Sequence, residues 1–147
     1  MAQSPHLPSD ATDLAEDIRE LFEDLSRSGA TSQSTYSGDC HPSIDVRETD
    51  QTVEVTMDVA GVPATSIRIL FRSSVLLVAG DKPPEPAAAG PMFHLIERTF
   101  GRFARAVRLS GAFNVQDARA TLRDGELTIT LPKQPDRRGR AHRISIA

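Results

Sequence analysis

Cysteine and histidine are the first residues to examine for chemistry. Cys40 and His41 are adjacent, and a thiol beside an imidazole could form a nucleophile–base pair. Adjacent side chains point in different directions, however, and no third group is in place to orient the imidazole. His6, His41, His94 and His142 do not have the spacing of a metal-ligand set. We therefore expect no enzyme activity and no bound metal.

Four arginines could instead form a stripe that binds nucleic acid: Arg98, Arg102, Arg105 and Arg108. Residues 102–109 have the composition of a strand, in which alternate side chains point to opposite faces. Arg102 and Arg108 then share one face. The other face carries Phe103, Arg105, Val107 and Leu109. The arginines do not form a stripe, and a net charge of −3 also makes nucleic acid an unfavourable partner.

Arg105 is the exception that this alternation leaves, because its charge lies in an apolar row. A buried charge must be paired or lie at an interface. The alternative is a guanidinium that reaches solvent over its neighbours.

Other chemistry has no visible motif. The sequence contains neither G-x-x-x-x-G-K-[ST] nor G-x-G-x-x-G, so we expect no nucleotide or other cofactor. The longest apolar run, VLLVA at 75–79, is too short to span a membrane. No secretory signal is recognisable, and the single cysteine excludes an internal disulfide. We expect a cytoplasmic protein.

The charge is unevenly distributed along the chain. Residues 1–40 contain eight acidic and two basic residues. Residues 41–131 contain eleven acidic and ten basic residues, and residues 132–147 contain one acidic and five basic residues. This asymmetry predicts two terminal arms with different roles around a nearly neutral domain. We place an N-terminal arm at 1–41, a folded domain at 42–133 and a C-terminal extension at 134–147.

The N-terminal arm contains one predicted amphipathic helix at 12–29, with Thr12 as the N-cap and Gly29 as the stop signal. Its apolar stripe consists of Leu14, Ile18, Leu21, Phe22 and Leu25. A single helix of this length is marginal in water, so the stripe must be buried against another surface. Packing on its own domain and contact with other subunits or with bound proteins are equally compatible with the pattern.

Short β-rich segments follow, separated by turn signals. The predicted strands are 44–48, 53–59, 66–71, 75–79, 93–98, 102–109, 117–122 and 126–131. Their number and spacing favour an all-β fold, an antiparallel immunoglobulin-like β-sandwich with a helical N-terminal arm and an extended C-terminal tail. The Pro/Ala-rich loop 81–92 is long for a compact domain, and such loops usually have a function.

These segments, in this order, resemble the α-crystallin domain of small heat-shock proteins of the bacterial and plant type. The resemblance covers residues 42–133 and the end of the chain. It rests on PSIDV (42–46), DVAGVP (58–63), VLLVAGDK (75–82), ERTFGRFARAVRL (97–109), ATLRDGELTITLPK (120–133) and the terminal ISI (144–146).

The resemblance implies an ATP-independent chaperone, a holdase that binds partly unfolded client proteins and prevents their aggregation. It also implies that homodimers build larger oligomers. Dimers of this family form by exchange of a strand from the long loop. Met92, Phe93 and His94 would then pair with the partner's edge strand, which contains Ile44 and Val46. Arg105 would lie near the dimer interface.

The same resemblance implies a role for the tail. Ile144 and Ile146 would dock into a groove on another subunit, between the strands at 66–71 and 117–122. Alternation would place Ile69 and Phe71 on one wall of this groove. The other wall would contain Ala118, Ala120 and Leu122. The helical stripe at Leu14 to Leu25 would contact clients or other subunits. A non-chaperone structural or adaptor module on the same sandwich is the alternative, although such modules generally lack the Ile-x-Ile tail.

Overall fold

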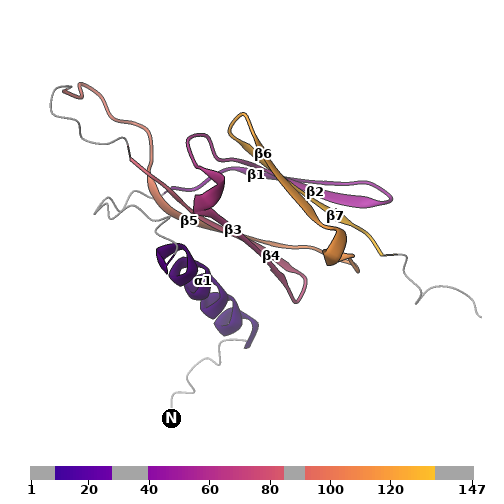
Figure 1. Ribbon diagram of the computed structural model, residues 1–147. Coiled ribbons are helices and arrows are strands. Elements are labelled where there is room, and N and C mark those ends of the chain that lie inside the picture. Colours follow the sequence, from indigo (N-terminus) through magenta and orange to yellow (C-terminus); the bar gives the residue numbers. More distant parts are fainter. Residues whose placement is uncertain (1–8, 28–39, 85–91, 135–147) are drawn as a thin grey trace, which may run out of the picture.

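The computed structural model describes residues 9–27, 40–84 and 92–134 (Figure 1). The elements are α1 (Ser9–Arg27), β1 (Ile44–Glu48), β2 (Thr52–Asp58), η1 (Ala64–Ser66), β3 (Ile67–Arg72), β4 (Val75–Lys82), β5 (Gly101–Arg108), η2 (Val115–Asp117), β6 (Arg119–Arg123) and β7 (Glu126–Pro132). The all-β sandwich with a helical N-terminal arm is confirmed.

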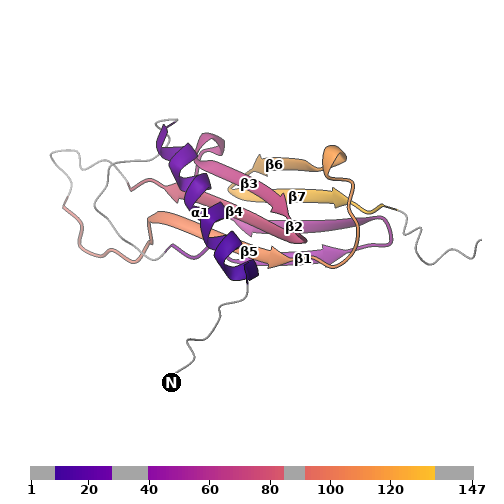
Figure 2. The same cartoon turned by 90° about the horizontal axis from the view of Figure 1, so that it is seen from below.

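The strands form two antiparallel sheets. One has four strands in the order β1-β2-β7-β6, and the other has three in the order β3-β4-β5. Figure 2 shows that β3 lies along the same side of the sandwich as β6, whereas β5 lies along the same side as β1. The edge strands of the two sheets therefore lie in pairs along the two sides of the domain.

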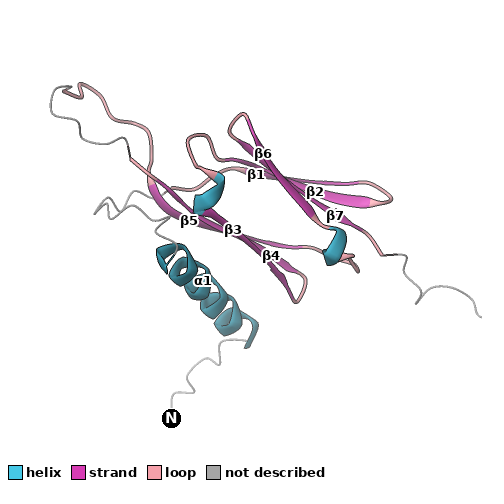
Figure 3. Ribbon diagram, viewed as in Figure 1, coloured by secondary structure: helices cyan, strands magenta, loops and turns pink. Residues whose placement is uncertain are grey.

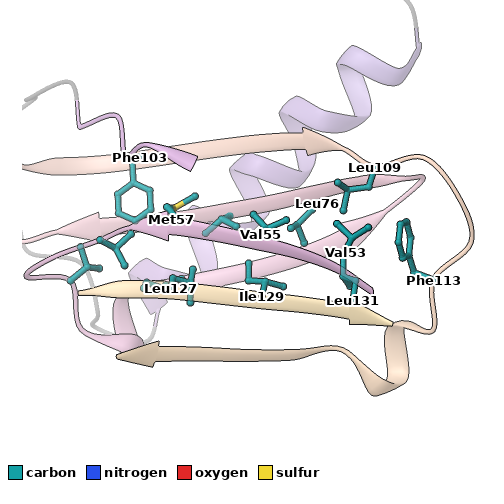
Figure 4. Packing of buried hydrophobic residues seen from close by; sticks show 14 residues of the cluster. Val53, Val55, Met57, Leu76, Phe103, Leu109, Phe113, Leu127, Ile129 and Leu131 are labelled. Carbon is teal, nitrogen blue, oxygen red and sulfur yellow. The ribbon is translucent and has the colours of Figure 1, made fainter. Parts of the chain in front are cut away.

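The core lies between the sheets and follows strand alternation. The strand β2 buries Val53, Val55 and Met57, and half-buried polar residues separate them. Leu76 from β4, Phe103 from β5, and Leu127, Ile129 and Leu131 from β7 complete the centre of the cluster (Figure 4). Because one face of each strand is apolar, a one-residue change of register would expose this face.

Two-residue turns set the register of two hairpins. Asp124 and Gly125 have φ angles of 51° and 78°, and they connect β6 to β7. Ser73 and Ser74, with φ angles of 50° and 65°, connect β3 to β4 in the same way. Left-handed conformation at both central residues matches the twist of the flanking strands. Both turns fall in the gaps between predicted strands, one between 66–71 and 75–79 and the other between 117–122 and 126–131.

The predicted strand at 93–98 is absent from this single chain. Residues 92–100 form a loop that projects from the sandwich between β4 and β5 (Figure 3). A strand exists only when its backbone bonds to a neighbouring strand, and no such neighbour pairs with these residues in the described part of the chain. The prediction is therefore wrong for the isolated protomer.

The helix α1 covers the outer face of the three-stranded sheet (Figures 1 and 2). Beneath it, Leu77 and Ala79 of β4 are buried although they do not belong to the sandwich core. Of the two alternatives left open by the sequence, packing on its own domain is the one observed. The predicted start was wrong, because the helix begins at Ser9 and continues through Thr12, which is not the N-cap. Its last described residue is Arg27, so the stop at Gly29 lies outside the described residues.

The chain after β7 is fixed by its main chain before the tail begins. The amide of Lys133 donates to the Gln51 carbonyl at 2.8 Å, and the amide of Gln134 donates to the Ala112 carbonyl at 2.9 Å. An isolated β-bridge joins Lys133 to Phe113. The tail therefore starts from a defined point at Gln134.

Candidate functional site: docking surfaces

The described residues contain no metal-binding cluster. No three His, Cys, Asp or Glu side chains there are grouped so that they could hold a metal ion. Cys40 is half-buried against the core, whereas the neighbouring His41 is exposed. Within the same ranges, no helix is long and apolar enough to cross a membrane. The candidate sites are surfaces with exposed apolar side chains.

The faces predicted for the arginine-rich strand are confirmed. Arg102 and Arg108 are exposed on β5, whereas Phe103 is buried. Arg105 is half-buried on the inner face, and its Nη1 donates to the Pro42 carbonyl at 2.7 Å. This bond connects β5 to the segment before β1, on the side where these edges meet. Arg105 is thus paired within its own protomer, and a role in dimers stays a prediction.

Exposed apolar side chains lie in the projecting loop. Met92, Phe93, Leu95 and Ile96 are 80%, 62%, 74% and 55% exposed, and His94 between them is also exposed. A run of large exposed apolar residues marks an interaction surface more often than a monomer surface. Sequence reasoning identified Met92, Phe93 and His94 but missed Leu95 and Ile96, which the same apolar run could have indicated.

The base of this loop is held in place by an aromatic ring. The Lys82 ammonium lies 5.6 Å, and the Arg98 guanidinium 5.1 Å, from the centroid of the Phe100 ring. Cations at this distance are attracted to the ring face. The loop therefore projects from a fixed base at the ends of β4 and β5.

The strand β1 also exposes apolar surface. Ile44 pairs with Met57 and Val46 with Val55, so both side chains point toward the inner face of the sheet. Ile44 is half-buried against the core, but Val46 is 48% exposed. An inward-facing valine that remains exposed at a sheet edge indicates an incomplete interface.

The residues predicted for the tail groove come from the opposite pair of edges. Ile69 is on β3 and is 37% exposed, and Phe71 is half-buried with its ring 5.8 Å from that of Phe113 in a T-shaped contact. On the β6 side, Ala118 and Leu122 are half-buried against the core and Ala120 is exposed. The two predicted walls thus lie on the same side of the sandwich (Figure 2). Ile144 and Ile146 lie outside the described residues.

The apolar stripe of α1 faces its own sheet. Leu25 is fully buried, and Leu14, Ile18, Leu21 and Phe22 are half-buried. The Arg102 guanidinium of β5 also lies over the Phe22 ring, 5.2 Å from the ring centroid. A shallow cavity of 480 Å³ at this junction is lined by Arg19, Phe22, Glu23, Arg27 and Arg102.

Two ion pairs hold α1 against the edge strand β3. Arg72 Nη1 lies 2.6 Å from Asp17 Oδ1, and Arg68 Nε lies 2.7 Å from Asp24 Oδ2. The hydrogen bond from Arg68 holds the pKa of Asp24 below its ordinary value. Desolvation opposes this lowering, and the charges of Arg68 and Arg27 add to it. Sequence reasoning missed these pairs. The sequence pattern that could have indicated them is a pair of arginines four positions apart on a strand and a pair of aspartates seven positions apart on a helix.

Comparison with known proteins identifies the domain. Residues 45–147 match the Hsp20/alpha crystallin family. The chain is 34% identical over 95 residues to spore protein SP21 of Stigmatella aurantiaca, which is 65% of this chain and 56% of that protein. It is 38% identical over 109 residues to a 21.9 kDa heat shock protein of rice, which is 68% of this chain and 53% of that protein. The matches thus span about half the length of these two relatives.

The fold comparison agrees with these matches. Heat shock protein 16.0 from Schizosaccharomyces pombe superposes with a TM-score of 0.63 and 28% identity, over 74% of this chain and all of that chain. A small heat-shock protein from Xylella fastidiosa has the same TM-score at 23% identity, which supports the fold alone. The sandwich, its strand order and the family match over residues 45–147 place this chain in the Hsp20/alpha crystallin family of small heat-shock proteins.

Proposed function

We propose that this protein is a cytoplasmic, ATP-independent holdase that binds partly unfolded proteins and prevents their aggregation. Membership of a chaperone family that is not enzymatic supports the general role. The observation that carries the proposal is exposed apolar surface on an α-crystallin sandwich, here Leu95 and Ile96, which lie outside the segment proposed for strand exchange. The three-part organisation of arm, domain and extension is part of the same proposal.

The building block in this proposal is a dimer formed by exchange of the projecting loop. Residues 92–94 would add as a strand to the free edge of the partner's β1, which pairs only with β2 in the described part of this chain. Such pairing would cover Phe93 and the exposed Val46, and it would satisfy the backbone groups of both segments. Arg105 would support this side of the domain through its bond to Pro42.

The tail would connect dimers into larger oligomers. Ile144 and Ile146 would dock on Ile69, Phe71, Ala118, Ala120 and Leu122 of a neighbouring subunit. Burial of two isoleucine side chains contributes about 3–6 kcal/mol before the cost of ordering the tail. Each contact would therefore be weak and reversible, but many contacts in one oligomer would add up.

The direct test of the proposed activity is an aggregation assay without ATP. A thermally or reductively destabilised client is incubated with the full chain, and light scattering is recorded over time. We expect suppression at about one subunit per client chain and no effect of added ATP, because binding requires only apolar contact. An equal mass of an unrelated protein is the control. If scattering were the same as in this control at every temperature, the holdase function would be refuted.

A further inference from the structure

The edge strand β3 presents two different docking faces. Ile67, Ile69 and Phe71 lie on the face of β3 that is turned toward the other sheet. This face borders the groove in which the tail is proposed to bind. Arg68, Leu70 and Arg72 alternate with them and point toward the opposite face. Burial and contacts agree with this division, since Ile67 belongs to the core cluster and both arginines contact α1.

The contact with α1 follows β3 over most of its length. Asp17 and Asp24 are seven residues apart, about 10.5 Å along a helix, and Arg72 and Arg68 are four apart, about 13 Å along a strand. The two separations are similar, so both ion pairs form at once, at 2.6 and 2.7 Å. Asp17 is only 6% exposed, which makes it the anchor of this contact.

Arg68 also binds the backbone at the start of its own strand. Its Nη1 donates to the carbonyl of Thr65 at 2.9 Å and to that of Ile67 at 3.0 Å, while its Nε binds Asp24. The position of this guanidinium therefore depends on the backbone that enters β3. Any change that loosens this backbone also loosens the attachment of α1.

The strand has support from only one neighbour. Among the described strands, β3 pairs with β4 alone, and it ends in a turn with two serines at positive φ. A ligand that orders such an edge from one face reduces the ordering cost for a ligand on the other face. The effect is reciprocal, because coupling between two binding equilibria acts equally on both.

We propose that β3 couples the two docking sites, so that a tail bound on the Ile69 and Phe71 face tightens α1 on the Arg68 and Arg72 face. Loss of the tail then loosens α1 and uncovers Leu77 and Ala79 together with the stripe that contains Leu25. The partner for these surfaces is an apolar segment of a non-native polypeptide. The inference rests on the proposed tail docking and adds its regulation: one event opens both the groove and the helix-covered face.

Hydrogen exchange of the full-length protein tests the coupling. In the Ile144→Ser/Ile146→Ser variant, we expect the amides of α1 to exchange at least fivefold faster, while those of β2 and β7 stay unchanged. Smaller assemblies without a change in α1 exchange would refute the coupling but leave tail docking intact. Assemblies of unchanged mass would refute tail docking, and with it the coupling.

A peptide supplied in trans separates the coupling from a general effect of assembly size. The peptide RRGRAHRISIA, which corresponds to residues 137–147, can fill the groove of the double variant but cannot link subunits. We expect it to restore slow exchange in α1 while the assemblies remain small. The same peptide with both isoleucines replaced by serine should have no effect. If the isoleucine peptide also leaves α1 exchange unchanged, β3 does not couple the two sites.

The reverse direction uses matched charge changes on one helix. Asp17→Asn/Asp24→Asn removes both contacts with β3, whereas Glu16→Gln/Glu20→Gln removes two exposed acids from the same helix. We expect subunit exchange, which requires tail release, to accelerate at least fivefold in the aspartate variant only. Equal rates in the two variants would contradict the reciprocity that coupling demands.

Discussion

At position 80 the strand β4 has no side chain, and the ring of Phe103 occupies the space that one would need. A Cβ on Gly80 would lie 2.4 Å from Cζ of Phe103 and 2.8 Å from the carbonyl oxygen of Ser66. Both values are well below ordinary contact distances. The two sheets can therefore enclose a buried phenylalanine at this end of the core because its neighbour on β4 is glycine.

Gly80→Ala should destabilise the domain by about 1–3 kcal/mol, because an added methyl forces a packed ring and a backbone carbonyl to move. Urea denaturation followed by circular dichroism would measure the loss. The double variant Gly80→Ala/Phe103→Leu tests whether the clash with the Phe103 ring causes the loss of stability. If overpacking against the ring is responsible, the alanine costs less in the leucine background than in the wild type. An equal cost in both backgrounds would assign the effect to the Ser66 carbonyl.

At the scale of elements, the attachment of α1 to β3 depends on charge. The pKa of Asp24 is held below its ordinary value, mainly by the hydrogen bond from Arg68. A carboxyl whose pKa is lowered in the docked state favours docking above its ordinary pKa, near 3.9, and this contribution is lost as pH falls through the lowered value. The attachment should thus be insensitive to pH near neutrality.

We expect α1 exchange, corrected for its intrinsic pH dependence, to be constant from about pH 8 to pH 5 and to rise below about pH 4. Asp24→Asn should show faster exchange already at neutral pH and a smaller increase in acid. Protection of β2 and β7, measured in the same samples, separates helix release from global unfolding. A variant with the same acid dependence as the wild type would show that Asp24 does not mediate the effect.

Strand positions were predictable from the sequence, whereas the placement of α1 was not. Alternation such as Val53-Glu54-Val55-Thr56-Met57 requires a half-buried strand whatever the rest of the fold is. An apolar stripe, by contrast, shows only that one face of a helix is buried. Asp17 and Arg72 are 55 residues apart, and nothing local connects them.

The candidate sites divide in the same way. The face of Arg105 follows from residue types and alternation, whereas Met92, Phe93 and His94 were expected at an interface only from the family resemblance. The partner of Arg105 does not, because a backbone carbonyl such as that of Pro42 has no signature in the sequence. The segment at 93–98 has strand composition, but hydrogen bonds to a second strand decide whether it becomes one.

For the whole molecule, the proposed dimer predicts that one exposed valine contributes to dimer stability and another does not. Val46 on β1 and Val115 on η2 are 48% and 47% exposed, but only Val46 lies at the edge where the exchanged loop would pair. Val46→Ser should weaken the dimer, because a hydroxyl then replaces an apolar contact in the interface.

Native mass spectrometry at decreasing protein concentration would measure the fraction of monomer for each variant. We expect Val46→Ser to dissociate at least tenfold more readily than the wild type, a cost of about 1.4 kcal/mol. Val115→Ser should match the wild type. Equal dissociation of the two variants would place the dimer interface elsewhere on the sandwich.

The fixed start of the tail limits how subunits can be arranged. The amide of Gln134 is bonded to the Ala112 carbonyl, so the chain leaves each domain from one position. Ile144 lies ten positions after Gln134, and a fully extended chain over ten positions spans at most about 35 Å. Each domain therefore defines a sphere of that radius around its Gln134. Only assemblies that place a neighbour's Ile69 and Leu122 within this sphere can be closed by the tails.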